Sequence, residues 1–204
     1  FSQQTAWFAD AKLGIFIHWG MYAADGTSES WAFHNRTVPY KQYMSQMKGF
    51  AAENYNPIAW AQLIKESGAK YCVITTKHHD GFCMFDSKLT DYTVANPSCP
   101  NSQSTHPDLT KRIFDAFRAE GLWIGAYFSK PDWHHPDYLP RRAWDTRPTD
   151  GAQYGRYIEY MKGQLKELTS GRYGKVGILW FDGEWEGTWT HEMGKDLYDY
   201  CRAL

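Results

Sequence analysis

The chain has 204 residues, of which 43% are hydrophobic and 22% charged, as in an ordinary globular protein. A net charge of −1 gives no electrostatic basis for binding nucleic acid or an anionic membrane surface. No apolar run approaches the length of a membrane span, and the four cysteines form no Cys-x-x-Cys pair that would suggest zinc or a disulfide framework.

The first predicted element is a short helix at residues 2–11, with Trp7 and Phe8 packing inward. Residues 13–20 predict a strand because they are apolar and partly β-branched and end at a glycine. Residues 21–52 are expected to be irregular, since Gly, Ser, Asn and Pro recur there.

Two further strands and helices alternate after this region. Residues 58–67 predict a helix capped by Asn56, and residues 70–76 predict the second strand. Residues 108–120 predict another helix that stops at a glycine, and residues 122–128 predict the third strand.

The last predicted unit consists of a helix at 150–168 capped by Asp150, a strand at 176–181 and a helix at 189–204. The strand is a continuous apolar run, which is typical of a parallel strand buried on both faces.

The last of these predicted strands leads directly into a carboxylate. Asp182 follows it, and by strand alternation Asp182 shares a face with Trp180. A carboxylate beside an aromatic ring at the mouth of a fold is compatible with a site that breaks a sugar bond. The aromatic content of 17% fits a large aromatic core, with some rings left to stack on sugar faces.

Strands that alternate with helices indicate an α/β fold with a parallel sheet, whose ligands bind at the carboxyl ends of the strands. The chain contains four such units, in a single domain over residues 1–204. We expect them to be about the first half of a (β/α)8 TIM-like barrel, because long loops follow the strands, as in such barrels, and the chain stops within a helical pattern. A compact four-unit sheet is the alternative.

Four runs occur at the predicted strand ends. They are Gly-Ile-Phe-Ile-His-Trp-Gly (14–20), Thr-Thr-Lys-His-His-Asp-Gly-Phe (75–82), Gly-Ala-Tyr-Phe-Ser (125–129) and Leu-Trp-Phe-Asp-Gly-Glu-Trp (179–185). Together, and in this order, they resemble the α-L-fucosidases of glycoside hydrolase family twenty-nine, from about Trp7 to Trp185. The resemblance implies a retaining glycosidase that removes terminal α-L-fucose through a covalent fucosyl-aspartate intermediate, without cofactor or metal.

The resemblance also implies site residues. Asp182 matches the nucleophile. The matching substrate-binding residues are the histidines His18, His78 and His79, the tyrosine Tyr127, the apolar walls Phe16 and Trp180, and Trp31 with Glu29. The family places Glu directly before Trp, whereas here Ser30 intervenes, so the contact of Glu29 with sugar is open. His78 and His79 can both reach a ligand only if the backbone turns, which Gly81 makes easier.

In the family, the acid/base is a carboxylate on a loop well downstream of the nucleophile. We therefore expect it to lie outside this chain, with Glu184 and Glu186 as local candidates. Two alternatives remain open. One is a non-catalytic fucose-binding remnant of the same fold; the other is a metal-dependent barrel hydrolase, although the His-x-His pattern often used by such enzymes is not found at the first strand.

The expected partner is a fucosylated oligosaccharide or glycoconjugate, with no nucleic acid and no membrane. From the resemblance we expect a secreted, periplasmic or lysosomal protein. The sequence leaves the oligomeric state and the preferred linkage open.

Overall fold

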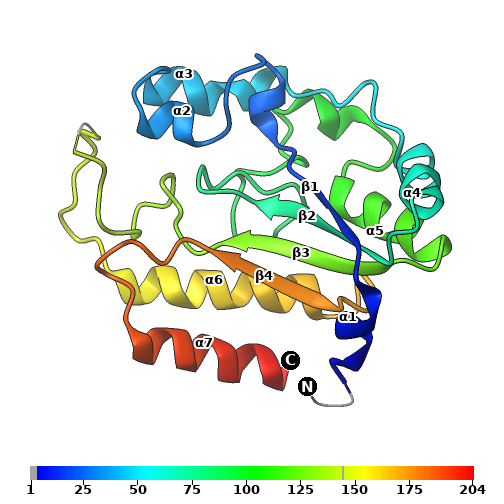
Figure 1. Ribbon diagram of the computed structural model, residues 1–204. Coiled ribbons are helices and arrows are strands. Elements are labelled where there is room, and N and C mark those ends of the chain that lie inside the picture. The colour runs from blue at the N-terminus through cyan, green and yellow to red at the C-terminus, as the bar shows by residue number, and fades with distance from the viewer. Residues whose placement is uncertain (1–3, 144) are drawn as a thin grey trace.

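The computed structural model describes residues 4–143 and 145–204, and a four-stranded parallel sheet is its centre. The strands lie in chain order: β1 (Gly14–Ile17), β2 (Tyr71–Lys77), β3 (Trp123–Ser129) and β4 (Ile178–Asp182). All four arrows point the same way in Figure 1, so the carboxyl ends of the strands meet at one edge. This confirms the predicted α/β fold with a parallel sheet.

Helices connect the strands and cover the sheet. The α-helices are α1 (Ala6–Ala11), α2 (Trp31–His34), α3 (Tyr40–Ser45), α4 (Pro57–Glu66), α5 (Leu109–Ala119), α6 (Tyr154–Thr169) and α7 (His191–Ala203). Three short 3-10 helices are η1 (Met21–Ala23), η2 (Gln46–Gly49) and η3 (Pro100–Gln103). Within the described residues, no helix has the length and apolar character needed to cross a membrane.

Local capping explains where several helices begin. The Asn56 side chain accepts a hydrogen bond from the Ala59 N–H at 3.0 Å, so the predicted cap of α4 is confirmed. The predicted cap of α6 is wrong, because the helix begins at Tyr154 and not at Asp150. Gly151 adopts a φ of +76°, which turns the chain before the helix can start.

Three expectations near the N-terminus need correction. The helix expected at 2–11 begins only at Ala6, because residues 4 and 5 form a turn, and residues 2 and 3 lie outside the described residues. Trp7 stacks on Trp123 with ring centroids 4.1 Å apart, whereas Phe8 stays 40% exposed and does not pack inward. The region 21–52 is not wholly irregular, because short helices form there.

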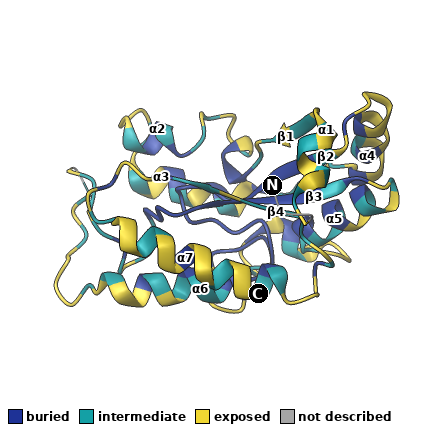
Figure 2. Ribbon diagram, turned by 60° about the horizontal axis from the view of Figure 1, so that its bottom comes forward, coloured by how far each residue is buried: buried dark blue, intermediate teal, exposed yellow. Residues whose placement is uncertain are grey.

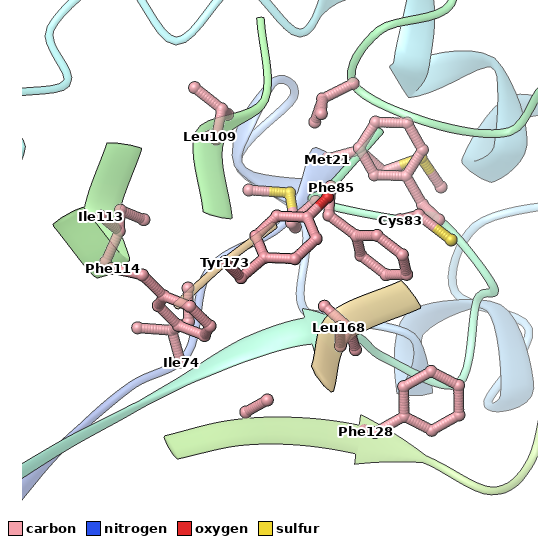
Figure 3. Packing of buried hydrophobic residues seen from close by; sticks show 14 of the residues in the cluster. Met21, Ile74, Cys83, Phe85, Leu109, Ile113, Phe114, Phe128, Leu168 and Tyr173 are labelled. Atoms are coloured by element: carbon pink, nitrogen blue, oxygen red, sulfur yellow. The ribbon is translucent and has the colours of Figure 1, made fainter. Parts of the chain in front are cut away.

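The hydrophobic core lies between one face of the sheet and the helices. Ile124, Ala126 and Phe128 of β3 are buried on this face. Figure 3 shows Ile74 of β2 and Phe128 beside residues of α5 and the end of α6. Tyr127 lies on the opposite face of β3. There it pairs in register with Trp180 of β4, close to the carboxyl ends of the two strands.

The expectation that the fourth strand is buried on both faces is wrong. β4 is the last strand of the described sheet and pairs with β3, so its residues are partly buried, and Trp180 is 44% exposed. Figure 2 shows the contrast with β2 and β3, which are buried almost throughout. An apolar sequence shows that a strand can be buried, but the neighbouring elements decide how far it is.

A bulge in β2 changes the direction of the chain before the two histidines. Thr75 pairs with Tyr127, whereas Lys77 pairs with Phe128, so the register shifts between them. Lys77 therefore points to the core face, where Nζ lies 4.3 Å from the centre of the Phe128 ring. The chain turns directly after this strand.

Candidate active site

The site residues come from the carboxyl ends of all four strands. His18 follows β1, His78 and His79 follow β2, Tyr127 lies near the end of β3, and Asp182 is the last residue of β4. The side-by-side order of the strands brings these residues to one edge of the sheet, next to the loops seen at that edge in Figure 1.

Asp182 is held by a tyrosine of the neighbouring strand. The Tyr127 hydroxyl donates a hydrogen bond of 2.6 Å to Oδ2 of Asp182. Burial and this carboxylate raise the pKa of Tyr127 well above its usual range, so the phenol keeps its proton and remains a donor. The Asp182 side chain is 38% exposed, so it is fixed at one oxygen yet open to a ligand.

The three histidines form one cluster beside this carboxylate. The ring centroids of His78 lie 4.1 Å from those of His79 and 4.6 Å from those of His18. The turn expected at the adjacent pair is confirmed, since both rings reach the same place, and Gly81 follows with a φ of +79°. A Cβ at Gly81 would lie 2.3 Å from Oδ1 of Asp132, so glycine is required here.

Burial keeps these imidazoles neutral. Burial is the largest cause of the low pKa of both rings, which is about 2 for His78 and about 3 for His79. The neighbouring His79 contributes to the lowering at His78, and Lys77 contributes to it at His79. The pKa of His18 is also lowered, mainly by burial, while Glu29 and Asp182 act in the opposite direction. Near neutral pH the cluster therefore offers uncharged rings, each with one donor and one acceptor nitrogen.

Two serines hold the buried histidines. Ser30 Oγ lies 2.5 Å from Nδ1 of His78, and Ser129 Oγ lies 2.6 Å from Nδ1 of His79. Neither serine was identified from the sequence. The only signal for Ser129 was its place at the end of the third predicted strand, where a polar side chain can meet a neighbouring strand end.

Aromatic rings border the cluster on two sides. Phe16 lies edge-on to Tyr127 and to Trp180, with centroids 5.7 Å and 5.6 Å apart. Trp31 lies 5.7 Å from His79 and 5.6 Å from Trp185 by the same measure. The structure thus brings the expected apolar walls to the same site as the histidines.

One further aromatic residue of the site was missed. Trp133 lies in the long loop after β3, and its ring centroid is 5.2 Å from that of His79 and 5.4 Å from that of Trp31. The backbone N–H of Trp133 donates to the His79 carbonyl at 2.7 Å, which ties the loop to the turn after β2. A tryptophan within a proline-rich loop gave no period or spacing from which this contact could be predicted.

Glu29, whose contact with the sugar the sequence left undecided, lies beside the histidine cluster. Its Oε2 accepts a hydrogen bond from the Trp31 N–H at 2.9 Å and lies 4.0 Å from Nδ1 of His78. The inserted Ser30 therefore does not remove this carboxylate from the site. It instead gives the cluster the hydroxyl that contacts His78.

The two local acid candidates are both held in ion pairs. Glu184 lies 2.6 Å from Nζ of Lys130 and its side chain is 77% exposed. Glu186 is 9% exposed and forms an ion pair with Arg142, whose guanidinium also lies over the Trp133 ring. Each carboxylate therefore has a cationic partner of its own.

Three further histidines, His106, His134 and His135, have other surroundings. His134 stacks on Tyr92 with centroids 4.1 Å apart, and His135 packs on Tyr160 at 4.4 Å. His106 is exposed.

The site also contains a possible ligand set for a cation. In the described residues, ligand atoms of His78, His79 and Asp182 lie within 4.8 Å of one another. Two imidazoles and a carboxylate can bind a transition metal, so geometry alone leaves both metal chemistry and sugar chemistry possible.

Comparison with known proteins identifies the family of the chain. The sequence profile of the α-L-fucosidases matches residues 2–203. The tissue α-L-fucosidase of Bos taurus is 34% identical over 207 residues, which cover 94% of this chain and 42% of the bovine protein. The α-L-fucosidase of Branchiostoma floridae is 32% identical, with 91% of this chain and 42% of that protein covered.

Solved structures agree. The α-L-fucosidase isoenzyme 1 from Paenibacillus thiaminolyticus superimposes with a TM-score of 0.86 at 41% identity, covering 99% of this chain and 48% of that chain. The α-L-fucosidase AlfC from Lactobacillus casei, solved in complex with α-L-fucose product, gives 0.84 at 28% identity, covering 99% and 67%. The chain spans less than half the length of the curated relatives named above. Because the profile match runs over almost every residue, the chain belongs to the α-L-fucosidase family.

Proposed function

We propose that this chain carries the sugar-binding and nucleophile-bearing part of an exo-acting, retaining α-L-fucosidase, with Asp182 as nucleophile. The observation that supports this most is a partly exposed carboxylate, fixed at Oδ2 by the Tyr127 hydroxyl, beside three neutral histidines. The AlfC complex with α-L-fucose supports fucose as the sugar.

In this proposal, Oδ1 of Asp182 attacks the anomeric carbon while the bond to the leaving oxygen breaks, and a fucosyl-aspartate ester forms. Water then attacks the same carbon and releases fucose and the free carboxylate, with retention of configuration. The hydrogen bond from Tyr127 keeps Oδ2 from competing for the sugar, so one oxygen holds position and the other reacts.

A second carboxyl group must protonate the leaving oxygen, at about 5–5.5 Å from the nucleophile in retaining enzymes. We propose that neither Glu184 nor Glu186 has this role, because Lys130 and Arg142 already engage them. The family resemblance implies an acid/base on a loop well downstream of the nucleophile, and we propose the same arrangement here.

Recognition of fucose is proposed to divide between polar and apolar groups. His18, His78 and His79 face the ring hydroxyls. A sugar that lacks one of these hydroxyls leaves a buried imidazole without its hydrogen-bond partner, which costs binding free energy. Phe16 and Trp180 provide the apolar wall for the C5 methyl group, a contact that contributes about 1–3 kcal/mol of discrimination. Trp31 borders the same sugar from the other side.

We also propose that the sheet is part of a (β/α)8 barrel. Four parallel strands in sequential order, each followed by a site-bearing loop, support this architecture. The partly exposed strand β4 and the solvent-exposed ring of Phe16 are then surfaces that further strands of such a barrel would face.

The test uses an aryl α-L-fucoside with a good leaving group, which needs little acid assistance. The full chain should release a burst of aryl alcohol, and Asp182→Ala should abolish the burst while fucose still binds. Binding without a burst in the unsubstituted chain would instead support a non-catalytic fucose-binding protein.

The histidine–carboxylate cluster defines the second candidate, a metal-dependent hydrolase. Under our proposal the burst persists after prolonged treatment with a chelator. A burst that is lost on chelation and restored by added Zn²⁺ would move the function to metal-assisted hydrolysis.

A further inference from the structure

The hydroxyl proton of Ser129 can be located from its two neighbours. Ser129 Oγ lies 2.7 Å from the carbonyl oxygen of Pro131 and 2.6 Å from Nδ1 of His79. A carbonyl oxygen can only accept, so the single hydroxyl proton must point to Pro131; otherwise two lone pairs would face each other at 2.7 Å. Nδ1 of His79 must then carry a proton and donate it to Ser129.

This assignment decides what His79 presents to the site. With the proton on Nδ1, Nε2 of the neutral ring is an acceptor, and it lies 3.8 Å from Oδ2 of Asp182. That oxygen is also an acceptor and already receives the Tyr127 hydroxyl. Two acceptor atoms therefore face each other, at a spacing across which one sugar hydroxyl can donate its proton to both in a bifurcated hydrogen bond.

The Pro131 carbonyl, which accepts the Ser129 hydroxyl, lies against the backbone around Asp182. Ser129 is the register partner of Asp182, and the next residue, Lys130, donates its N–H to the Asp182 carbonyl at 3.0 Å. A Cβ on Gly183 would come within 2.1 Å of the Pro131 ring, and Gly183 has a φ of +90°. The Pro131 carbonyl is thus held in place by the same backbone that presents Asp182.

We propose that Ser129 is a positioning residue that locks His79 as a hydrogen-bond acceptor, so that this point of the site selects a sugar hydroxyl that donates to both His79 Nε2 and Asp182 Oδ2. The sugar specificity rests on the proposed function; the ring state of His79 does not. The site should accordingly reject an analogue that carries an acceptor-only group at this position.

The ring state can be measured in the full chain without any sugar. Nitrogen NMR on the ¹⁵N-histidine-labelled protein, assigned with His79→Gln, should show His79 as a neutral ring protonated at Nδ1. In Ser129→Ala the proton should move wholly or partly to Nε2, and Ser129→Thr, which retains a hydroxyl, should restore Nδ1–H. A wild-type ring protonated at Nε2 would overturn the proposal even if no variant folds.

Ser87 provides a matched control away from the site. It is 4% exposed, and its hydroxyl donates to Oε2 of Glu167 at 2.7 Å, so Ser87→Ala also removes a buried serine hydrogen bond. Ser87→Ala should leave the protonation site of the His79 ring unchanged. A shift of the His79 tautomer in Ser87→Ala as large as in Ser129→Ala would overturn the proposal, because the effect would then be general loosening.

The second measurement compares binding of L-fucose with its monodeoxy and monofluoro analogues, in which one hydroxyl is replaced at a time. At one position, fluorine should weaken binding by at least about tenfold more than hydrogen, because fluorine cannot donate and faces two acceptors. In Ser129→Ala this excess penalty should shrink about tenfold, because the ring can now donate from Nε2, and in Ser87→Ala it should persist.

Equal penalties for fluorine and hydrogen at every position, or an unchanged pattern in Ser129→Ala, would overturn the proposed selection. If no fucose analogue binds at all, the proposed function and the selection both fail, and the nitrogen spectrum alone decides whether Ser129 fixes the His79 ring.

Discussion

The Tyr127 hydroxyl and Oδ2 of Asp182 are 2.6 Å apart, and they come from adjacent strands whose register makes this contact diagonal. Tyr127 pairs with Trp180, two residues before Asp182, so the phenol reaches forward along the shared face to the carboxylate. The backbone pairing of β3 and β4 therefore decides which oxygen of Asp182 is held and which is free.

Replacing Tyr127 by Phe tests this hydrogen bond. A hydrogen bond to a charged group is worth about 1.5–3 kcal/mol, so Tyr127→Phe should lower kcat for an aryl fucoside about ten- to a hundredfold if the bond matters in the transition state. The affinity for fucose should change less than kcat, because we propose that the histidines make the main polar contacts with the sugar. Steady-state kinetics and fucose binding measure the two effects separately.

Tyr173 is the matched control for this substitution. It is fully buried, and its hydroxyl donates to Oδ2 of Asp108 at 2.6 Å in a different part of the fold. Tyr173→Phe should reduce the free energy of unfolding but leave kcat unchanged. A similar loss of kcat in both variants would show that Tyr127 acts through stability and not through Asp182.

The buried histidines predict a dependence of stability on pH. A histidine in the unfolded chain has a pKa near 6.5, whereas the folded values are about 2 for His78 and about 3 for His79. Below pH 6.5 the unfolded chain binds protons that the folded chain does not, so stability falls as the pH drops toward 3. Each histidine contributes a slope of about 1.4 kcal/mol per pH unit.

Urea unfolding at several pH values between 6.5 and 4 measures this slope. His79→Gln should flatten it by about 1.4 kcal/mol per pH unit, whereas the exposed His106→Gln is the control and should leave it as it is. An identical slope in the His79→Gln variant would contradict the neutral, buried state assigned to this ring.

The ion pair of Arg142 and Glu186 predicts a large effect on stability. Both side chains are only 9% exposed, so Glu186→Ala leaves a buried guanidinium without its partner and should lower the free energy of unfolding by about 3–5 kcal/mol. The exposed pair of Lys195 and Asp199 is the control, since Asp199→Ala should cost only about 0–1 kcal/mol. Comparable losses in the two variants would mean that the Arg142 pair is not effectively buried.

The dependence of kcat/KM on the leaving group tests the proposal that Glu184 is not the proton donor. Loss of the acid slows substrates with poor leaving groups far more than those with good ones. Glu184→Gln should therefore keep the ratio of kcat/KM values for the two kinds of aryl fucoside. A selective loss with the poor leaving group would identify Glu184 as the proton donor.

The sequence allowed the sheet and the strand-end residues to be predicted because both depend on local patterns. Apolar runs predicted all four strands, and the motifs after them led to His79 and Asp182, which the structure brings together. Contacts between distant loops left no such pattern. Trp133 reaches His79 through loop geometry, and Ser129 gains its importance from the Pro131 carbonyl and a ring 50 residues away.

The incorrect expectations have the same origin. The exposure of β4 depends on which elements cover it, and the start of α6 depends on the turn at Gly151 and not on a capping residue type. Burial and turn geometry are tertiary properties, so residue preferences alone predicted them poorly.

The central claim is that Asp182 forms the bond to the sugar, and covalent trapping tests it most directly. A 5-fluoro-fucosyl fluoride keeps every ring hydroxyl, needs no acid to release fluoride, and forms a sugar ester that turns over slowly. After incubation with the full chain, proteolysis and mass spectrometry should find one added fluorofucosyl group on the peptide that contains Asp182. Labelling of Glu29, Glu184 or Glu186 in place of Asp182, or equal labelling in Asp182→Ala, would contradict the account.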